Sequence, residues 1–102
     1  MVAVHNNLGN AYRTQHQFEQ AASSFEVVTQ LSPQLSSAWI NLGSVLLTLS
    51  DSTDKSLLKK AQACFSRALA LEQEADSKER QTATRNLQRV DALLKVPNQG
   101  QE

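Results

Sequence analysis

Few residues in this chain of 102 could do covalent or metal chemistry. The candidates are His5, His16 and Cys64, which are scattered through the sequence and do not have the spacing of metal ligands. We expect His5 to be a packing residue in the middle of a helix, and His16 to cap or solvate a turn. No neighbour of Cys64 in the sequence supplies a base for its thiol. The nucleophile elbow, the phosphate loop and the HExxH motif are also missing. We therefore expect no enzyme activity, no metal and no cofactor.

Asparagine amides offer a different chemistry, at Asn6, Asn7, Asn10 and Asn41. An amide both donates and accepts hydrogen bonds, so it can pair with the C=O and N–H groups of a bound peptide whatever the side chains of that peptide are. The alternative is that these amides bond to solvent or to neighbouring turns. We favour peptide binding, because Asn7 and Asn41 occupy the same place in two copies of one local pattern.

That pattern is an internal repeat. Asn-Leu-Gly at 7–9 recurs at 41–43, a spacing of 34 residues. Each copy is followed by an apolar stripe at i, i+4 and i+7, which is the spacing of one helix face; the two stripes are Ala21, Phe25 and Val28, then Ala61, Phe65 and Ala68. Each copy is therefore predicted to be a pair of helices. The first helix of each pair carries a glycine, Gly9 or Gly43, where close packing leaves no room for a side chain.

The repeat resembles the tetratricopeptide repeat (TPR), whose signature is W-x2-L-G-x2-Y, then A-x3-F, then P, over 34 residues. The first copy, 2–35, carries Leu8, Gly9, Tyr12, Ala21, Phe25 and Pro33 at the expected steps, with His5 at the tryptophan position and Val28 at a usual alanine. The second copy, 36–75, carries Trp39, Leu42, Gly43, Ala61, Phe65 and Ala68. It departs from the signature at Leu46 and Gln73, and it has six extra residues between its helices. The resemblance implies an all-α fold, a right-handed α-α superhelix of two TPR helix pairs.

Five helices are expected, at 2–14, 18–31, 36–49, about 54–71 and 76–95. Pro33 ends the second helix, and Ser36 or Ser37 is placed to cap the third. The insertion is expected to lengthen the loop after the third helix together with the fourth helix. Asp76 and Glu79 have the spacing of a capping box at the start of the fifth helix.

The fifth helix is expected to close the stack. Its apolar stripe, formed by Ala83, Leu87, Val90 and Leu94, would pack on the second repeat, and its outer side, with Lys78, Arg80, Arg85 and Arg89, would face water. The TPR domain would then span 1–96, followed by a disordered tail at 97–102.

The resemblance also implies a binding groove, because the first helices of such repeats line a concave face that holds peptides of partner proteins. Mapped by repeat position, the first repeat presents Ala3, Asn6, Asn7, Asn10, Arg13 and Thr14. The second presents Ser37, Ile40, Asn41, Ser44, Leu47 and Thr48. Ile40 and Leu47, if exposed, would add apolar area, and Arg13 would meet an acidic side chain.

We therefore interpret the chain as a protein–protein interaction module that binds a peptide segment of a partner protein. One alternative is a structural segment of a longer TPR array, which stacks or forms a homo-oligomer through its uncapped first helix. A second alternative is a co-chaperone that grips the C-terminal peptide of a chaperone. Asn10 and Asn41 fit the asparagine places of such clamps, but Asn6 stands where the lysine is needed, so the strongest charge is missing.

Composition excludes several other classes. Ten basic and ten acidic residues cancel, and the five aromatic residues all fall at positions that the repeat pattern uses, so no nucleic-acid partner is expected. The longest apolar run, 68–71, is far too short to insert in a membrane. Residues 1–10 lack the pattern of a signal peptide, and Cys64 alone cannot form an internal disulfide. These features favour an intracellular, cytoplasmic location.

Overall fold

The computed structural model describes residues 2–50, 55–72 and 77–95. These ranges hold five helices and no strand: α1 (Val2–Thr14), α2 (Phe18–Leu31), α3 (Ser36–Leu49), α4 (Ser56–Leu71) and α5 (Lys78–Lys95). The predicted bounds of the first three helices are confirmed, whereas α4 begins two residues later than expected. The predicted tail at 97–102 lies outside the described residues.

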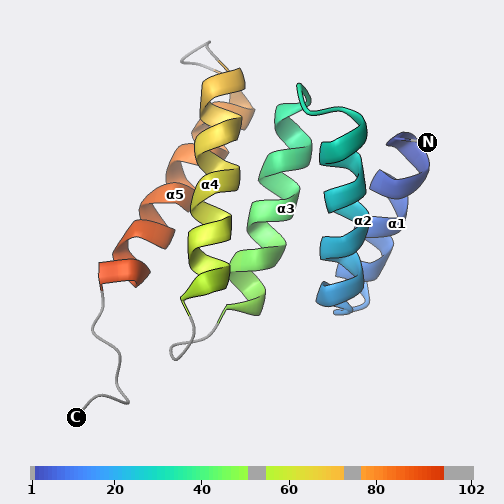
Figure 1. The fold of residues 1–102 in the computed structure, drawn as a ribbon, viewed down its shortest axis with the longest axis horizontal. Coiled ribbons are helices and arrows are strands. Elements are labelled where there is room, and N and C mark those ends of the chain that lie inside the picture. Colours follow the sequence, from blue (N-terminus) through green and yellow to red (C-terminus); the bar gives the residue numbers. More distant parts are fainter. Residues whose placement is uncertain (1, 51–54, 73–76, 96–102) are drawn as a thin grey trace.

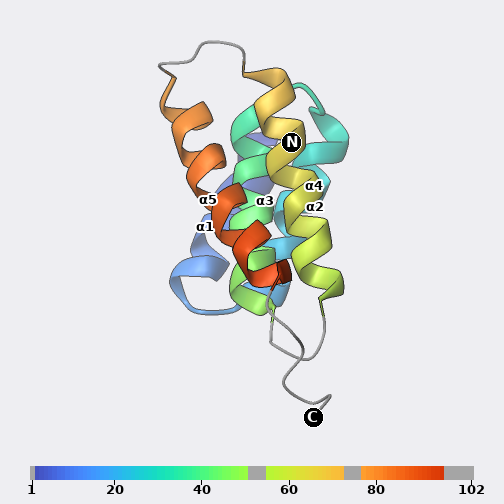
Figure 2. The same cartoon turned by 90° about the vertical axis from the view of Figure 1, so that its left-hand side faces the viewer.

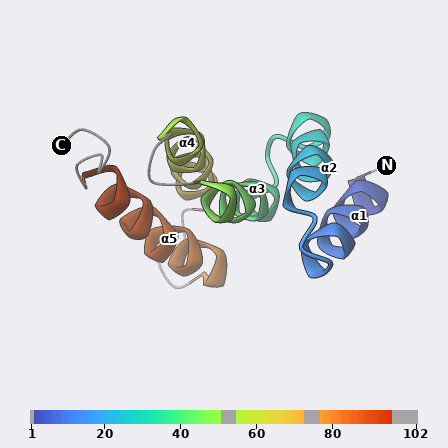
Figure 3. The ribbon, with the colours of Figure 1, turned by 90° about the horizontal axis from the view of Figure 1, so that it is seen from below.

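The helices stack in chain order, each beside the one before it (Figure 1). Figure 2 shows the same stack from its C-terminal end, with α5 lying across α3 and α4. Viewed from below, α2 and α4 lie on one side of the stack and α1 and α5 on the other, with α3 between them (Figure 3). One side of α3 therefore faces α5, and another faces the space between α2 and α4.

A glycine holds each helix pair together at close range, as the sequence predicted. A Cβ atom built on Gly9 would lie 2.6 Å from the Phe25 ring, and one on Gly43 would lie 2.9 Å from the Phe65 ring. Both rings are fully buried. Because real Cβ atoms do not approach other atoms this closely, each ring packs against helix backbone that carries no side chain at the glycine. The contact is the same in the two repeats.

The six-residue insertion is divided among three places. α3 ends six residues after Gly43, whereas α1 ends five residues after Gly9. The connection at 50–55 is three residues longer than that at 15–17. α4 starts five residues before Ala61, whereas α2 starts three residues before Ala21. The prediction that the loop and α4 grow together is thus confirmed, and α3 grows as well. Residues 51–54 lie outside the described part of the chain.

The predicted cap of α3 is wrong, and the one predicted for α5 lies outside the described residues. The residue before α3 is Leu35, and the Ser36 hydroxyl does not cap α3 but donates to the Glu72 carboxylate at 2.8 Å, which links the start of α3 to the end of α4. That carboxylate also lies favourably near the positive end of the α3 dipole. At α5, Asp76 lies outside the described residues, and the Ser77 hydroxyl accepts the Arg80 backbone N–H at 2.9 Å, as an N-cap does.

α4 and α5 are joined at both ends by cations that bond to carbonyl groups. Lys55 Nζ donates to the Leu94 carbonyl at 3.1 Å, and Arg80 Nη1 donates to the carbonyls of Leu69 and Glu72 at 3.1 and 2.8 Å. Each cation thus meets the negative end of the other helix. Arg80 was expected to face water, and that prediction is wrong, because the last turn of α4 leaves carbonyls that need donors. Between these ends, Ala83 and Val90 are fully buried, and Leu87 and Leu94 pack beside them, as predicted.

Candidate functional site

Six of the predicted groove residues lie on one stripe of α3, beside α5. Two hollows lie along this seam, and we call them together the inner face. The first, of about 190 Å³, is lined by Ser37, Ile40 and Asn41 from α3 and by Lys78, Glu79 and Thr82 from α5. The second, of about 380 Å³, is lined by Ser44, Leu47 and Thr48 from α3 and by Asn86, Arg89 and Leu93 from α5.

Helical spacing explains why these residues meet. On α3 the lining positions recur every three or four residues from 37 to 48, and on α5 they do so from 78 to 93, so each set forms one stripe. Asn86 Nδ2 lies 3.5 Å from Ser44 Oγ, a long hydrogen bond that spans the seam. The inner face is therefore lined by amides, hydroxyls, two cations and one carboxylate, together with the apolar side chains of Ile40, Leu47 and Leu93.

The prediction for Ile40 was conditional on exposure, and the structure answers it. Ile40 is 7% exposed and belongs to the hydrophobic core, so it offers a ligand almost no apolar area. Leu47 is half-buried against the same core. Leu93 of α5, which is 41% exposed, lines the second hollow and offers more apolar area than either. Thr48 bonds its own helix, since its hydroxyl donates to the Ser44 carbonyl at 3.0 Å.

The predicted residues of α1 are arranged differently. Arg13 Nη2 donates to Asn10 Oδ1 at 2.7 Å, and the Arg13 guanidinium lies over the Phe25 ring at 5.6 Å from its centroid. Asn10 and Arg13 are thus engaged within their own repeat. Asn6 is half-buried and Asn7 is exposed. Neither asparagine lines the two hollows of the inner face, one of which is lined by Asn41.

Sequence reasoning missed the contribution of α5. Lys78 and Arg89 are exposed, as expected of the side that faces water, and they also line the hollows beside α3, which was not predicted. Arg85 lies elsewhere on α5, with Gln81, Thr84 and Gln88. The signal was present as a polar stripe of helical spacing at 78, 82, 86 and 89, parallel to the apolar stripe that was recognised.

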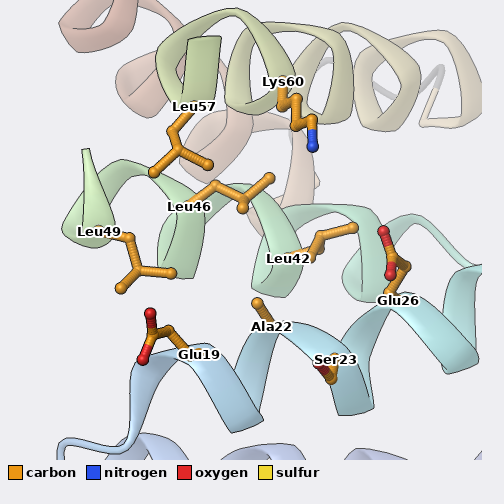
Figure 4. Close-up of a pocket in the computed structure, with 9 residues that line it drawn as sticks. All are labelled: Glu19, Ala22, Ser23, Glu26, Leu42, Leu46, Leu49, Leu57 and Lys60. Carbon is orange, nitrogen blue, oxygen red and sulfur yellow. The ribbon is translucent and has the colours of Figure 1, made fainter. Parts of the chain in front are cut away.

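A further hollow lies on the other side of α3, and we call it the outer groove (Figure 4). Its volume is about 340 Å³, and it runs between α2 and α4 with α3 as its floor. The lining residues are Glu19, Ala22, Ser23, Glu26, Leu42, Leu46, Leu49, Leu57 and Lys60. This groove has an apolar floor on α3 and charged side chains on both walls.

The candidate nucleophile and metal ligands of the sequence do not form a reactive centre. Cys64 is 5% exposed, and burial raises the pKa of its thiol to about 11, helped by the negative charge of Glu26. The thiol is therefore protonated at neutral pH and a poor nucleophile. His16 packs edge-on against Phe18, with ring centroids 5.6 Å apart. Within the described residues, no group of three or more His, Cys, Asp or Glu side chains is placed to hold a metal ion.

Comparison with known proteins identifies the fold family. Residues 2–35 match the family model of the tetratricopeptide repeat, the same stretch that the sequence pattern marks as the first repeat. This match identifies residues 2–35 as a tetratricopeptide repeat and does not define a sub-family. The stacked helices of the described residues are consistent with an all-α, TPR-like repeat fold. No curated protein sequence matched the chain. Tetratricopeptide repeats are generally protein-interaction modules, and within the described residues no helix is long and apolar enough to cross a membrane.

Proposed function

We propose that this protein is a non-catalytic interaction module that binds a peptide segment of a partner protein along its inner face. The observation that carries the proposal is the pair of hollows between α3 and α5, which are lined by six of the twelve residues mapped to the groove. Cys64 alone cannot close an internal disulfide, which supports our further proposal that the module works in the cytoplasm.

The lining of the inner face suits an extended and acidic segment. Amides and hydroxyls at Asn41, Ser44 and Asn86 can pair with the backbone of a peptide, which gives affinity without reading its sequence. Lys78 and Arg89 are eleven residues apart on α5, about 16 Å along the helix axis. An extended peptide covers this distance in about five residues, so acidic side chains at that separation would meet both cations.

The test compares two variants of the full chain. Asn41→Ala combined with Arg89→Gln removes one amide and one cation from the inner face, while Arg85→Gln removes the same charge from another place on α5. Partners captured from a lysate by the wild type and the Arg85→Gln variant, but lost by the double variant, would support the proposal. Titration of an identified partner segment should then show affinity weakened at least about tenfold. Equal capture by all three proteins would refute it, provided that circular dichroism shows unchanged helicity.

A structural role is the second candidate, and a specific observation supports it. α1 exposes an apolar stripe that includes Val4, 53% exposed, and Leu8, 41% exposed. Their counterparts one repeat later, Ala38 and Leu42, are 0% and 6% exposed, because α2 packs on α3. A helix of another repeat or another copy would cover α1 in the same way. Light scattering would detect self-association, which Leu8→Asp should abolish; a monomer at all concentrations would exclude a homo-oligomer.

The co-chaperone alternative has less support. Asn6 still stands where a lysine is required, and the Asn10 amide is bonded to Arg13. A carboxylate held by amides alone lacks the charge-assisted bonds of a tight clamp.

A further inference from the structure

The outer groove has features that the repeat pattern does not require. Leu49 is the last residue of the lengthened α3, and Leu57 lies in the turn that the insertion adds to the start of α4. At the corresponding places of the first repeat the chain has Gln15 and Gln17, both exposed and polar. The second repeat therefore places two leucines at one end of the groove where the first has two glutamines.

The floor of the groove is continuous and apolar. Leu42, Leu46 and Leu49 follow i, i+4 and i+7 along α3, and Leu57 continues the apolar surface on the α4 side (Figure 4). Leu42 and Leu46 are core residues, 6% and 8% exposed, so the half-buried Leu49 and Leu57 offer a ligand most of this apolar surface. Ala22, a small residue, faces them from α2 and keeps the groove open. A ligand that contacts this floor must bring apolar side chains.

Charges on the two walls define the rest of the ligand. Glu19 and Glu26 are exposed side chains on the α2 wall, seven residues or about 10 Å apart along the helix. Lys60, also exposed, extends toward the groove from the α4 wall (Figure 4). The effect of Glu26 on the pKa of the Cys64 thiol is consistent with its position on this side of the stack.

We propose that the outer groove docks an amphipathic helix of a partner protein that carries two basic side chains seven residues apart. Two helices lying side by side share the same rise per residue, so cations at i and i+7 would face Glu19 and Glu26 together. Leucine-like residues between them contact the floor, and an acidic residue on the opposite flank meets Lys60. The partner helix would then pack against α2, α3 and α4.

This ligand differs from that of the inner face. The inner face presents two cations, Lys78 and Arg89, against one carboxylate, Glu79, and suits an acidic segment, whereas the outer groove presents two carboxylates against one cation, Lys60. The inner face lies between α3 and α5 and the outer groove between α2 and α4, which lie on different sides of α3 (Figure 3). One protein can therefore hold two partners of opposite charge, and the outer groove does not depend on the function proposed for the inner face.

The experiment begins with a library of helix-forming peptides displayed on phage and selected against the whole chain. Enriched peptides should carry Lys or Arg at two positions seven residues apart, with leucine-like residues between them. The affinity of one enriched peptide, made synthetically and labelled, is then measured by fluorescence anisotropy. Glu19→Gln with Glu26→Gln should weaken binding about tenfold or more. Glu79→Gln, which removes a carboxylate from the inner face, and the Asn41→Ala, Arg89→Gln variant should both bind as the wild type does.

A charge reversal makes the test specific. The Glu19→Lys, Glu26→Lys variant should reject the selected peptide and bind its counterpart in which the two basic residues are replaced by glutamate. Circular dichroism checks that each variant keeps its helicity. Enriched peptides without the basic pair, or binding that is unchanged in the Gln and Lys variants, would overturn the proposal. Light scattering provides a second check. Self-association of the wild type that is lost in the Glu19→Gln, Glu26→Gln variant would also overturn the proposal, because a second copy of the chain would then occupy the groove.

Discussion

The two helix pairs share one internal contact but differ in their surroundings. The Gly9–Phe25 contact of α1 and α2 and the Gly43–Phe65 contact of α3 and α4 have almost the same geometry. Leu8 and Leu42 occupy the same repeat position, yet Leu8 is 41% exposed and Leu42 is 6% exposed. The repeat pattern therefore determines how a pair closes on itself, and the neighbouring helices determine how much of its surface remains open.

The charged residues are also distributed unequally between the two halves of the chain. Residues 1–50 contain three charged side chains, Arg13, Glu19 and Glu26, and all the others lie in 51–102. Arg13 bonds Asn10 within its own repeat, whereas Lys55 and Arg80 join α4 to α5. The Arg13–Asn10 bond is local to α1, whereas the bonds of Lys55 and Arg80 connect one helix with another.

The largest effect should come from removing the ring at the centre of the stack. Phe65→Ala leaves a cavity in a pair that has helices on both sides, so we expect the free energy of unfolding to fall by about 4 kcal/mol. Phe25→Ala should cost about 3 kcal/mol, because a pair with a neighbour on only one side relaxes more easily. Urea denaturation measures both values. Hydrogen exchange should show lost protection in all helices for Phe65→Ala and mainly in α1 and α2 for Phe25→Ala; the same exchange pattern for both variants would contradict this comparison.

The leucine pair tests the role of the neighbouring helix directly. Leu42→Ala should lower the free energy of unfolding by about 3 kcal/mol, because the side chain is buried between α2 and α4. Leu8→Ala, at the same repeat position, should change it by about 0.5 kcal/mol or less. Thermal unfolding of the two variants at equal concentration gives the comparison. Equal destabilisation would mean that α1 is covered in solution, as the structural alternative proposes.

Most of the fold could be predicted from the sequence because its signals are local. Helical periodicity and Pro33 define the first three helices to the residue, and Gly9 and Gly43 predict the close contacts with Phe25 and Phe65. Ends that depend on other parts of the chain were less predictable. Ser36 was expected to cap its own helix, whereas it bonds Glu72, a residue thirty-six positions away.

The candidate site was predictable only in part, because it depends on the rotation of α5 about its axis. The α3 half of the inner face follows from repeat positions. The packing of α5 determines which of its cations line the other half of the inner face. It places Lys78 and Arg89 beside α3 and Arg80 at the end of α4. The burial of Ile40 has the same origin, since a repeat position does not tell how closely the next helix covers it.

The third prediction uses Cys64, whose counterpart in the first repeat is the buried, non-titrating Ser24. The pKa of the thiol rises from 9.0 to about 11 on folding, chiefly because the thiolate would lose its hydration. The unfolded chain therefore loses this proton first as the pH rises. The raised pKa of the thiol therefore contributes roughly 2 to 3 kcal/mol to the free energy of unfolding. This contribution is fully present below pH 9 and is lost as the pH rises from 9 to about 11.

Urea denaturation at several pH values measures this decline. Lysines titrate in the same range, so the informative quantity is the difference between the wild type and Cys64→Ala, which lacks the thiol. That difference should shrink as the pH rises from 8 to 11 if the thiol is the cause. Ser24→Ala should give a difference that does not change over the same range. A pH-independent difference for Cys64→Ala would show that the buried thiol does not ionise differently in the two states.

The smallest effect is expected at the turn between α1 and α2, which is the shorter of the two connections within the helix pairs. His16 has a φ of 63°, in the left-handed region that glycine adopts without strain. His16→Gly relieves this strain but increases the freedom of the unfolded chain and loses the contact with Phe18, so the expected net gain is about 0.5 kcal/mol. Gln15→Gly, one residue earlier and without a positive φ, should instead lower stability by about 0.5 to 1 kcal/mol. Thermal unfolding of both variants decides the sign, and a loss of stability in both would mean that the ring contact of His16 outweighs its backbone strain.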